Sequence, residues 1–395
     1  MLPEIHVFMK QVIIIHYGEI ALKGNNRAFF ENKLKENIKK ALAGIRHTTI
    51  RRFRGRMVLE FSETHPRDIV VCRLKKVFGL SHFSFGTEVA RDLKAIKEEA
   101  VRLMEGEVFE SFRVDTRRAQ KDFPLTSVEV NREVGDHLQK WCGKRVDLKN
   151  AEATCFIEII ERNALVYTRK ERGPRGLPVG VSESAVSLLS SGIDSPVASF
   201  RMLKRGVKLV YAHFHSQPYT SASSQENAEK LVKLLAEYQF RAKAYFVPFI
   251  DIQKEIMAKA PAPLRVLLYR RYMVRLAERI ARLEKARALV TGESVGQVAS
   301  QTISNIRVVG EVTSLPILRP LASFDKEEIV AIAKEIGTFE ISTEPYEDCC
   351  SLFIPANPAT KAHPRQLSDA EGRLELDTLM DEAMARAEVK IFTNQ

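Results

Sequence analysis

At the centre of the chain stands the stretch Val186-Ser187-Leu188-Leu189-Ser190-Ser191-Gly192-Ile193-Asp194-Ser195-Pro196. Its apolar beginning predicts a strand over Val186–Leu189, and Ser195 followed by Pro196 is typical of a helix start, with serine as the N-cap. Small residues between a strand and a helix leave backbone N–H groups exposed, and the helix dipole favours an anion beside them. An ordinary strand–helix connection has the same local pattern, so the stretch alone indicates either a phosphate site or a plain turn.

The sequence from Ser187 onward alternates between strand-like and helix-like runs. Strands are expected at Ser187–Leu189, Lys208–His213, Ala242–Val247 and Ala288–Thr291, and helices at Pro196–Lys204, Gln225–Tyr238, Leu264–Glu284 and Lys326–Ile336. This alternation predicts an α/β domain with a parallel sheet and helices on both faces. Ligands of such sheets bind beyond the carboxyl ends of the strands. The polar turn 190–195 therefore lies at the edge where a ligand is expected.

Two small α+β units are predicted in the front part of the chain. The first, residues 1–65, has a strand at Val12–Tyr17, a helix at Asn26–Ala43 and a hairpin at Thr48–Phe61. The second, residues 66–170, has helices at Ile69–Phe78, Leu93–Glu105 and Ser127–Lys140 and strands at Ser111–Arg117, Thr154–Ile160 and Ala164–Thr168. Residues 171–185, with glycines and prolines at their centre, are predicted to link these units to a third domain, residues 186–395.

Basic charge is concentrated in the front part of the chain. Residues 1–180 contain 34 Lys and Arg against 24 Asp and Glu, whereas residues 181–395 contain 27 against 26. Excess positive charge in one region indicates a surface for a polyanion such as nucleic acid. A lysine-rich solvated surface gives the same count. We favour the nucleic-acid interpretation because the change in charge coincides with the predicted domain boundary.

Composition excludes several classes of protein. No apolar run approaches the roughly 20 residues that a membrane-spanning helix needs, and the first residues lack the pattern of a signal peptide. The five cysteines form neither a disulfide framework nor a zinc-binding spacing. We therefore expect a soluble cytoplasmic protein without a structural metal.

Six segments in a fixed order give the chain a family resemblance. They are His16-Tyr-Gly-Glu-Ile-Ala-Leu-Lys-Gly-Asn-Asn-Arg27, Gly176-Leu-Pro-Val-Gly180, the loop Ser190–Ser195, Thr291-Gly-Glu-Ser-Val-Gly-Gln-Val-Ala-Ser-Gln301, Arg319-Pro-Leu with Asp325-Lys-Glu327, and Tyr346-Glu-Asp-Cys-Cys-Ser351. Together they resemble the tRNA 4-thiouridine synthetase (tRNA uracil sulfurtransferase) family, in its form without a rhodanese domain. The resemblance extends over nearly the whole chain. It implies a ferredoxin-like domain, a THUMP RNA-binding domain and a PP-loop ATP pyrophosphatase domain.

This resemblance implies an ATP-dependent reaction on tRNA. The enzyme would adenylate the C4 oxygen of the uridine at tRNA position 8, pyrophosphate would leave, and sulfur would displace AMP to give 4-thiouridine. Two other functions fit part of the pattern. One is a PP-loop enzyme that adenylates another tRNA base or a small molecule, and the other is a catalytically silent RNA-binding protein. Ser191, which stands where the family has glycine, supports the silent protein and leaves the backbone conformation of the loop in question.

The resemblance also assigns roles to individual residues. Asp194 would help to hold Mg²⁺ on the ATP phosphates, and Lys326 would neutralise phosphate charge as the catalytic lysine. Taken alone, Asp194 is also a plausible helix cap and Lys326 a solvated lysine. The nucleotide contacts carried over are Leu188, Leu189, Ser190, Gly192, Asp194, Ser195, His213, Phe214, Arg270, Gly292 and Gln301. Gly292 would allow a close backbone approach.

Sulfur transfer requires a nucleophilic sulfur atom, and the thiolate is the reactive form of cysteine. Cys349 matches the cysteine of the family's PP-loop domain, and Cys350 is the alternative. Because no cysteine follows Cys350, we expect the sulfur to come from outside this chain, from a donor protein such as a cysteine desulfurase or from sulfide. The family resemblance further implies a homodimer.

Overall fold

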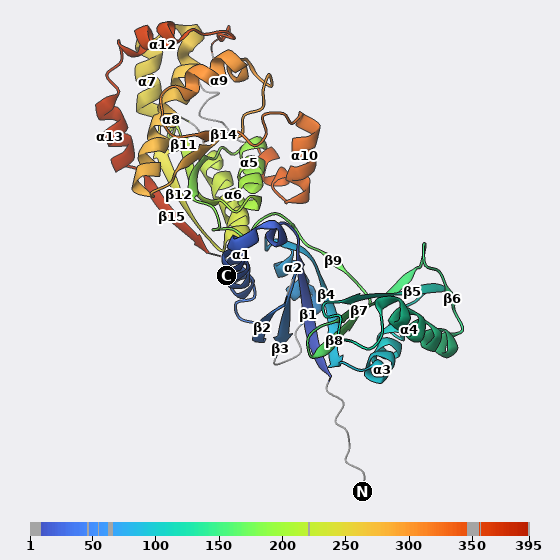
Figure 1. Cartoon of the computed structure of the whole chain (residues 1–395). Helices are drawn as coiled ribbons and strands as arrows, with labels where there is room; N and C mark the ends of the chain where they lie inside the picture. The colour runs from blue at the N-terminus through green and yellow to red at the C-terminus, as the bar shows by residue number, and fades with distance from the viewer. Residues whose placement is uncertain are drawn as a thin grey trace. The chain divides into compact units, whose positions relative to one another are not determined.

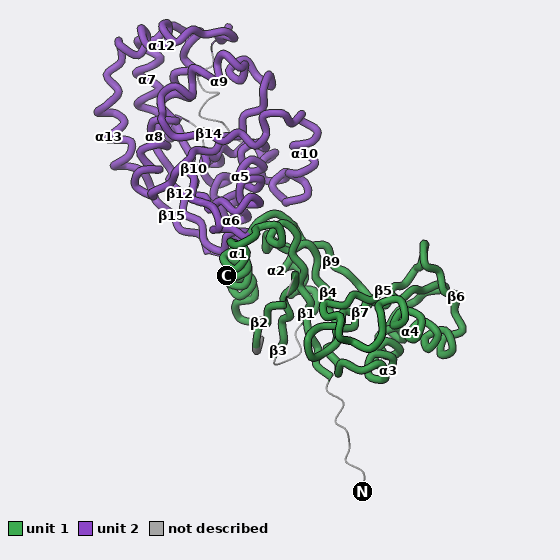
Figure 2. Tube along the Cα trace, in the orientation of Figure 1, with its two compact units in different colours: residues 1–177 green, residues 178–395 purple. Residues whose placement is uncertain are grey.

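The chain divides into two compact units, residues 1–177 and residues 178–395 (Figure 2). A computed structural model describes residues 9–45, 47–53, 55–61, 66–219, 222–345, 355 and 357–393. Within these ranges no helix is long and apolar enough to cross a membrane.

The first unit is built on one nine-stranded sheet with the order β2-β3-β1-β4-β8-β7-β5-β6, and β9 pairs with β4 beside β8. Its strands are β1 Lys10–Tyr17, β2 His47–Phe53, β3 Arg56–Phe61, β4 Leu80–Ala90, β5 Ser111–Arg118, β6 Arg145–Val146, β7 Ala153–Ile159, β8 Asn163–Tyr167 and β9 Glu171–Arg172. Its α-helices are α1 Arg27–Ala41, α2 Arg67–Leu74, α3 Leu93–Met104 and α4 Ser127–Cys142 (Figure 1). The predicted strands and helices of the front part are all present.

The long strand β4 joins the two small units predicted from the sequence. One of its edges pairs with β1, and its other edge pairs with β8. The predicted boundary at residue 65 precedes α2 and β4, so a cut there would separate β1 from its partner strand. The short strand β9, inside the predicted linker 171–185, also pairs with β4.

A buried carboxylate links distant strands of this sheet. Glu158 on β7 is only 2% exposed. Its Oε1 lies 2.8 Å from Nε2 of His16 on β1 and accepts a hydrogen bond of 2.7 Å from the hydroxyl of Tyr167 on β8. It also forms an ion pair with Arg56 on β3. Strands β3 and β7 are four positions apart, about 19 Å in a flat sheet, so the sheet must curl to bring them together.

The electrostatics of Glu158 follow from these contacts. Burial on its own raises the pKa of this carboxyl, but the hydrogen bond and charge of His16 and the charge of Arg56 outweigh burial and lower the pKa to about 2. The carboxylate is therefore ionised near neutral pH. The ring of His82 stacks on that of His16 at 4.3 Å, and burial lowers the pKa of His82 to about 4.

The second unit is the predicted α/β domain. Its six-stranded sheet has the order β14-β13-β10-β11-β12-β15. The strands are β10 Ser184–Leu188, β11 Lys208–His215, β12 Arg241–Pro248, β13 Ala288–Val290, β14 Ile317–Leu318 and β15 Glu388–Thr393. The first five in sheet order run parallel, and β15 is antiparallel to β12.

Two groups of helices pack against this sheet (Figure 1). In one group α5 and α6 pack together and against β11, with α10 beside α5; in the other, α8 packs against β10 and β13 and contacts α7 and α9. The bounds are α5 Asp194–Lys204, α6 Ser223–Gln239, α7 Ile250–Lys259, α8 Arg265–Leu283, α9 Ile303–Gly310, α10 Lys326–Glu335, α11 Phe339–Thr343, α12 Pro364–Glu371 and α13 Asp377–Ala385.

Two arginines of α8 pair with one carboxylate of α12. Arg271 is buried, and its Nε and Nη2 each donate to Glu371 of α12 at 2.8 Å. Arg275 donates to the same carboxylate at 2.7 and 3.0 Å. These ion pairs attach α12 to the core helix α8.

The buried cluster around Glu158 yields a prediction about stability. Glu158→Gln leaves Arg56 and His16 without a buried counter-charge, so we expect the free energy of unfolding to fall by about 3–5 kcal/mol. Urea unfolding followed by the fluorescence of Trp141, the single tryptophan of the chain and a residue of α4, measures this change in the first unit. The exposed neighbour Glu161→Gln is the matched control and should change the unfolding free energy by less than about 0.5 kcal/mol.

The difference in unfolding free energy between wild type and Glu158→Gln should change with pH in one direction. The pKa of Glu158 is lower in the folded chain, at about 2, than its ordinary value of 4.5. Its stabilising contribution is therefore complete above the ordinary pKa and is lost as the pH falls toward the folded pKa. The stability gap between wild type and Glu158→Gln should shrink between about pH 5 and pH 3. A gap that widens as the pH falls would contradict this account.

Candidate active site

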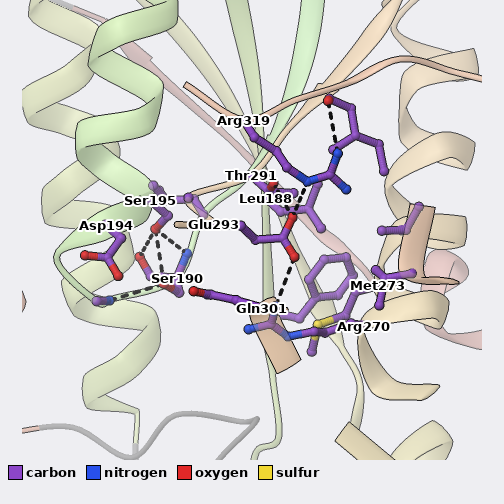
Figure 3. A pocket seen from close by; sticks show the side chains of 17 residues that line it. Leu188, Ser190, Asp194, Ser195, Arg270, Met273, Thr291, Glu293, Gln301 and Arg319 are labelled. Atoms are coloured by element: carbon purple, nitrogen blue, oxygen red, sulfur yellow. Dashed lines mark hydrogen bonds and ion pairs between the residues drawn. The ribbon is translucent and has the colours of Figure 1, made fainter. Parts of the chain in front are cut away.

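A cavity of about 320 Å³ opens at the carboxyl ends of β10, β11, β13 and β14 in the second unit (Figure 3). This is the sheet edge at which the sequence places a ligand. Most of the predicted nucleotide contacts line it: Leu188, Leu189, Ser190, Gly192, Asp194, Ser195, Phe214, Arg270, Gly292 and Gln301. Met273, Thr291, Glu293 and Arg319 complete much of its remaining wall.

The loop between β10 and α5 is held by its own serines. The N–H of Ser190 donates to Oγ of Ser195 at 2.9 Å, and that hydroxyl donates back to the carbonyl of Ser190 at 3.1 Å. The predicted cap is wrong, because α5 begins at Asp194 and its N-cap is Ile193, with no side-chain cap. Ser195 closes the loop instead of capping the helix. The first-turn N–H groups of α5 stay free of a side-chain cap beside the cavity, as an anion site requires.

Ser191 fits the loop without strain. Its backbone is not in the left-handed region, since the described non-glycine residues with positive φ are Arg175, Phe240 and Lys285. Its buried hydroxyl donates to the carbonyl of Ser224 on α6 at 2.6 Å. Serine at this position therefore ties the loop to α6 and does not distort it.

Gly292 is required by a close approach within the protein. A Cβ atom at this position would lie 2.7 Å from the backbone nitrogen of Ser195 and 2.9 Å from the carbonyl carbon of Asp194. Any side chain here would push the end of β13 away from the first turn of α5. Glycine was expected here so that a nucleotide could approach the backbone. In the structure it is the first turn of α5 that approaches Gly292 closely.

The two predicted catalytic residues Asp194 and Lys326 meet although 132 positions separate them. Nζ of Lys326 lies 2.5 Å from Oδ1 of Asp194, and Nε2 of Gln297 donates to Oδ2 at 2.9 Å. Asp325, with Glu328 in a capping box, fixes the start of α10 and so the backbone of Lys326. In the part of the chain that the structure describes, no group of three or more His, Cys, Asp or Glu could hold a metal ion.

His213 differs from the other predicted nucleotide contacts. It is buried behind the cavity wall, and its Nδ1 lies 2.9 Å from the carbonyl of Leu189. Burial lowers the pKa of His213 to about 4, so the ring is neutral near pH 7. The side chain does not line the cavity and supports Leu189 from behind.

Sequence reasoning gave no role to Glu293, Arg319 or Thr291. Glu293 accepts hydrogen bonds from Arg270, Arg319 and Thr291 within the cavity wall. The sequence held a signal for this network, because Glu293 and Thr291 belong to one of the quoted motifs and Arg319 begins another. What the sequence lacked was any sign that the two motifs touch.

The predicted thiol is not placed by the structure. Cys349 and its alternative Cys350 lie outside the described residues. Of the other three cysteines, all free, Cys72 is exposed and Cys142 half-buried. Cys155 is fully buried, which raises the pKa of its thiol to about 12 and leaves it unreactive.

Three family models match successive parts of the chain. The model of the ThiI ferredoxin-like domain matches residues 12–84, that of the THUMP domain matches residues 90–169, and that described as thiamine biosynthesis protein (ThiI) matches residues 180–376. The third match contains every residue of the cavity described above.

Similar proteins extend over almost the entire chain. The "Probable tRNA sulfurtransferase" of Moorella thermoacetica is 42% identical over 95% of this chain and 96% of its own length. The protein of the same name from Thermus thermophilus is 40% identical over 98% of this chain and 95% of its own length. A solved structure described as a 4-thiouridine synthetase–RNA complex with bound ATP superposes with a TM-score of 0.89, at 37% identity, over 97% of this chain and 100% of that one. The chain belongs to the ThiI family, whose relatives named here are tRNA sulfurtransferases.

Proposed function

We propose that this protein is an ATP-dependent tRNA sulfurtransferase that converts the uridine at tRNA position 8 to 4-thiouridine. The observation that carries the proposal is the cavity at the β10–α5 loop, whose lining residue Asp194 pairs with Lys326 beside the uncapped first turn of α5. The 4-thiouridine synthetase that this chain resembles over its full length binds RNA and ATP.

The reaction begins with activation of a poor leaving group. The O4 atom of the uracil attacks the α-phosphorus of ATP, the bond to pyrophosphate breaks, and the N3 proton of the uracil leaves to solvent. Backbone N–H groups of the loop 190–195 and of the first turn of α5 stabilise the negative charge of the departing pyrophosphate.

Lys326 and Asp194 help to compensate the negative charge of the phosphates in different ways. The ammonium of Lys326 neutralises phosphate charge as a point charge. Asp194 is the carboxylate that would hold Mg²⁺, which when bound neutralises phosphate oxygens; one protein carboxylate with substrate phosphates and water is an ordinary set of ligands for this ion. In the free protein Lys326 pairs with that carboxylate, so a turn of Lys326 toward the phosphates of bound ATP would leave Asp194 available to hold the cation.

The second step replaces the activated oxygen. A sulfur nucleophile attacks C4 of the adenylated uracil, the C4–O bond breaks, and AMP leaves with the former O4. We assign Cys349 as the thiolate that takes the outer sulfur of a persulfide on a donor such as a cysteine desulfurase, while the donor thiol leaves. The outer sulfur of the Cys349 persulfide then attacks C4, and a second thiol, from the donor or an added reductant, breaks the remaining S–S bond by forming a disulfide with Cys349 and so releases 4-thiouridine, whose N3 takes up a proton. Free sulfide can instead attack C4 directly, and its own proton passes to N3. The basic first unit holds the tRNA, and the protein works in the cytoplasm as a homodimer.

Chemical analysis of tRNA tests the proposal. Unmodified tRNA transcript, incubated with the protein, ATP, Mg²⁺ and sulfide, should yield 4-thiouridine in a nucleoside digest, and a transcript with cytidine at position 8 should not. A thiolated base other than 4-thiouridine would favour a PP-loop enzyme with a different target. No thiolated product, with tRNA still bound, would favour the silent RNA-binding protein.

Lys326→Gln tests the phosphate-binding role. Loss of one positioned cation should slow tRNA-dependent pyrophosphate release by about 10²- to 10³-fold, while tRNA affinity stays unchanged because the first unit is untouched. Lys334→Gln, on the exposed side of the same helix, is the control and should keep the wild-type rate. Full activity of Lys326→Gln would contradict the role.

The cysteine assignment requires two variants. Cys349→Ser should abolish thiolation supported by a persulfide donor, because a serine hydroxyl cannot carry sulfur, while calorimetry shows ATP binding unchanged. Cys350→Ser should retain thiolation. The opposite result would move the reactive thiol to Cys350.

The charge asymmetry predicts where tRNA binds. A fragment of residues 1–177, the first compact unit, should bind tRNA in a filter or gel-shift assay, and the fragment 178–395 should bind it much more weakly. Displaced counterions make such binding steeply salt-dependent, by about 10³-fold between roughly 50 and 200 mM salt for six phosphate contacts. An affinity of fragment 1–177 that is insensitive to salt would refute this assignment.

A further inference from the structure

Residues of two sequence motifs that have no assigned role, Glu293 and Arg319, meet in one ion pair (Figure 3). Glu293, in Thr291-Gly-Glu, accepts from Nη1 of Arg270 at 3.0 Å, from Nε of Arg319 at 2.7 Å and from the hydroxyl of Thr291 at 2.8 Å. Arg319 begins the Arg-Pro-Leu motif and lies directly after β14. The carboxylate therefore joins α8, β13 and β14 at the cavity wall.

Burial makes this network a fixed arrangement. Glu293 is 6% exposed, and a buried carboxylate is tolerated only when it is paired and hydrogen-bonded. Two guanidinium groups provide that pairing, so the three side chains carry one net positive charge. Each arginine is held in one orientation by the same carboxylate, and both line the cavity.

The cavity has an apolar side and a charged side. At the ends of β10 and β11, Leu188, Leu189, Phe214 and the nearby Met273 of α8 form apolar walls that suit the faces of a purine ring. At the ends of β13 and β14, Glu293 and Arg319 form the charged part of a wall to which Ile317 also contributes. The loop 190–195 lies between the two sides, since β10 separates β11 from β13 in the sheet.

Arg319 has hydrogen-bonding capacity left over. Its Nε donates to Glu293, its Nη1 contacts the carbonyl of Ile317 at 3.4 Å, and its buried Nη2 has no partner among the described residues. The side chain is 19% exposed at the cavity wall. Nη2 is covered by protein, so Nη1, whose contact with Ile317 is long, is the donor that an acceptor oxygen of a ligand would engage.

We propose that the β13–β14 side of the cavity is the uracil subsite, in which Arg319 donates to O2 of the target uridine. Glu293 is the positioning residue that holds Arg319 toward the uracil and Arg270 toward the nucleotide. This inference rests on the proposed function. Because O4 attacks phosphorus, O2 is the carbonyl oxygen of the uracil that remains free to accept a hydrogen bond from a guanidinium. When the N3 proton leaves, negative charge spreads over O2, N3 and O4, and a cation at O2 stabilises it.

Three variants distinguish a role in uracil binding from a role in ATP binding. Arg319→Lys keeps the charge but loses the planar fork, so we expect single-turnover formation of 4-thiouridine to slow about 10- to 100-fold. Its affinity for ATP, measured by calorimetry, should stay within about twofold of wild type, which also shows that the variant folds. Glu293→Gln should slow thiolation and weaken ATP binding together, because it releases both arginines. The exposed Arg307→Lys on α9, paired with Glu311, is the control and should change neither.

A modified substrate tests the contact with O2 itself. In tRNA whose target uridine carries sulfur in place of O2, the weaker acceptor should slow the wild-type protein about tenfold. It should slow Arg319→Lys little further, because that contact is already lost. A purely structural role of Arg319 would leave the two proteins equally sensitive to the substitution.

Two results would overturn the subsite. One is an ATP affinity of Arg319→Lys that falls as much as its rate of thiolation, which would place Arg319 on the nucleotide side. The other is equal slowing of wild type and Arg319→Lys by the sulfur-substituted uridine. Absence of 4-thiouridine with the wild-type protein and normal tRNA is a distinct result, which would overturn the proposed function and this subsite with it.

Discussion

The cavity of the second unit depends on how closely the end of β13 approaches the first turn of α5. At Gly292 even a Cβ atom would lie 2.7 Å from the backbone nitrogen of Ser195. This contact brings the segment after β13 against the β10–α5 loop, so that Gln297 reaches Asp194 and Glu293 faces the cavity. The uncapped first turn of α5, the carboxylate that pairs with Lys326, and Arg270 and Arg319 thereby border one small cavity.

The first unit contains most of the excess basic charge of the sequence. Its curled sheet is held by Glu158, whose partners come from three other strands. Because β4 is shared, the ferredoxin-like and THUMP parts form one continuous sheet. A polyanion bound to such a sheet meets both parts as one surface. The α/β unit, by contrast, has nearly equal numbers of basic and acidic residues.

The sequence predicted what depends on local pattern and missed what depends on contacts between distant segments. The alternation of strands and helices predicted the parallel sheet, and Ser190–Ser195 predicted the ligand edge. The cap at Ser195 was wrong because its hydroxyl is engaged by Ser190 across the loop. Glu293 and Arg319 were missed because their pairing arises from the register of β13 and β14. The edge strand β15 was missed although Val389 and Ile391 alternate with polar residues, because its pairing with β12 joins segments far apart in the chain.

In the proposed reaction, transfer of AMP to O4 activates the uracil, and one isotope experiment tests this step directly. The tRNA carries a heavy oxygen isotope at O4 of the position 8 uridine, and the products are analysed by mass spectrometry after a single turnover with ATP and sulfide. The account predicts that each 4-thiouridine formed is matched by one AMP molecule that contains the heavy oxygen in its phosphate. Heavy oxygen found in water or in inorganic phosphate, with unlabelled AMP, would contradict it.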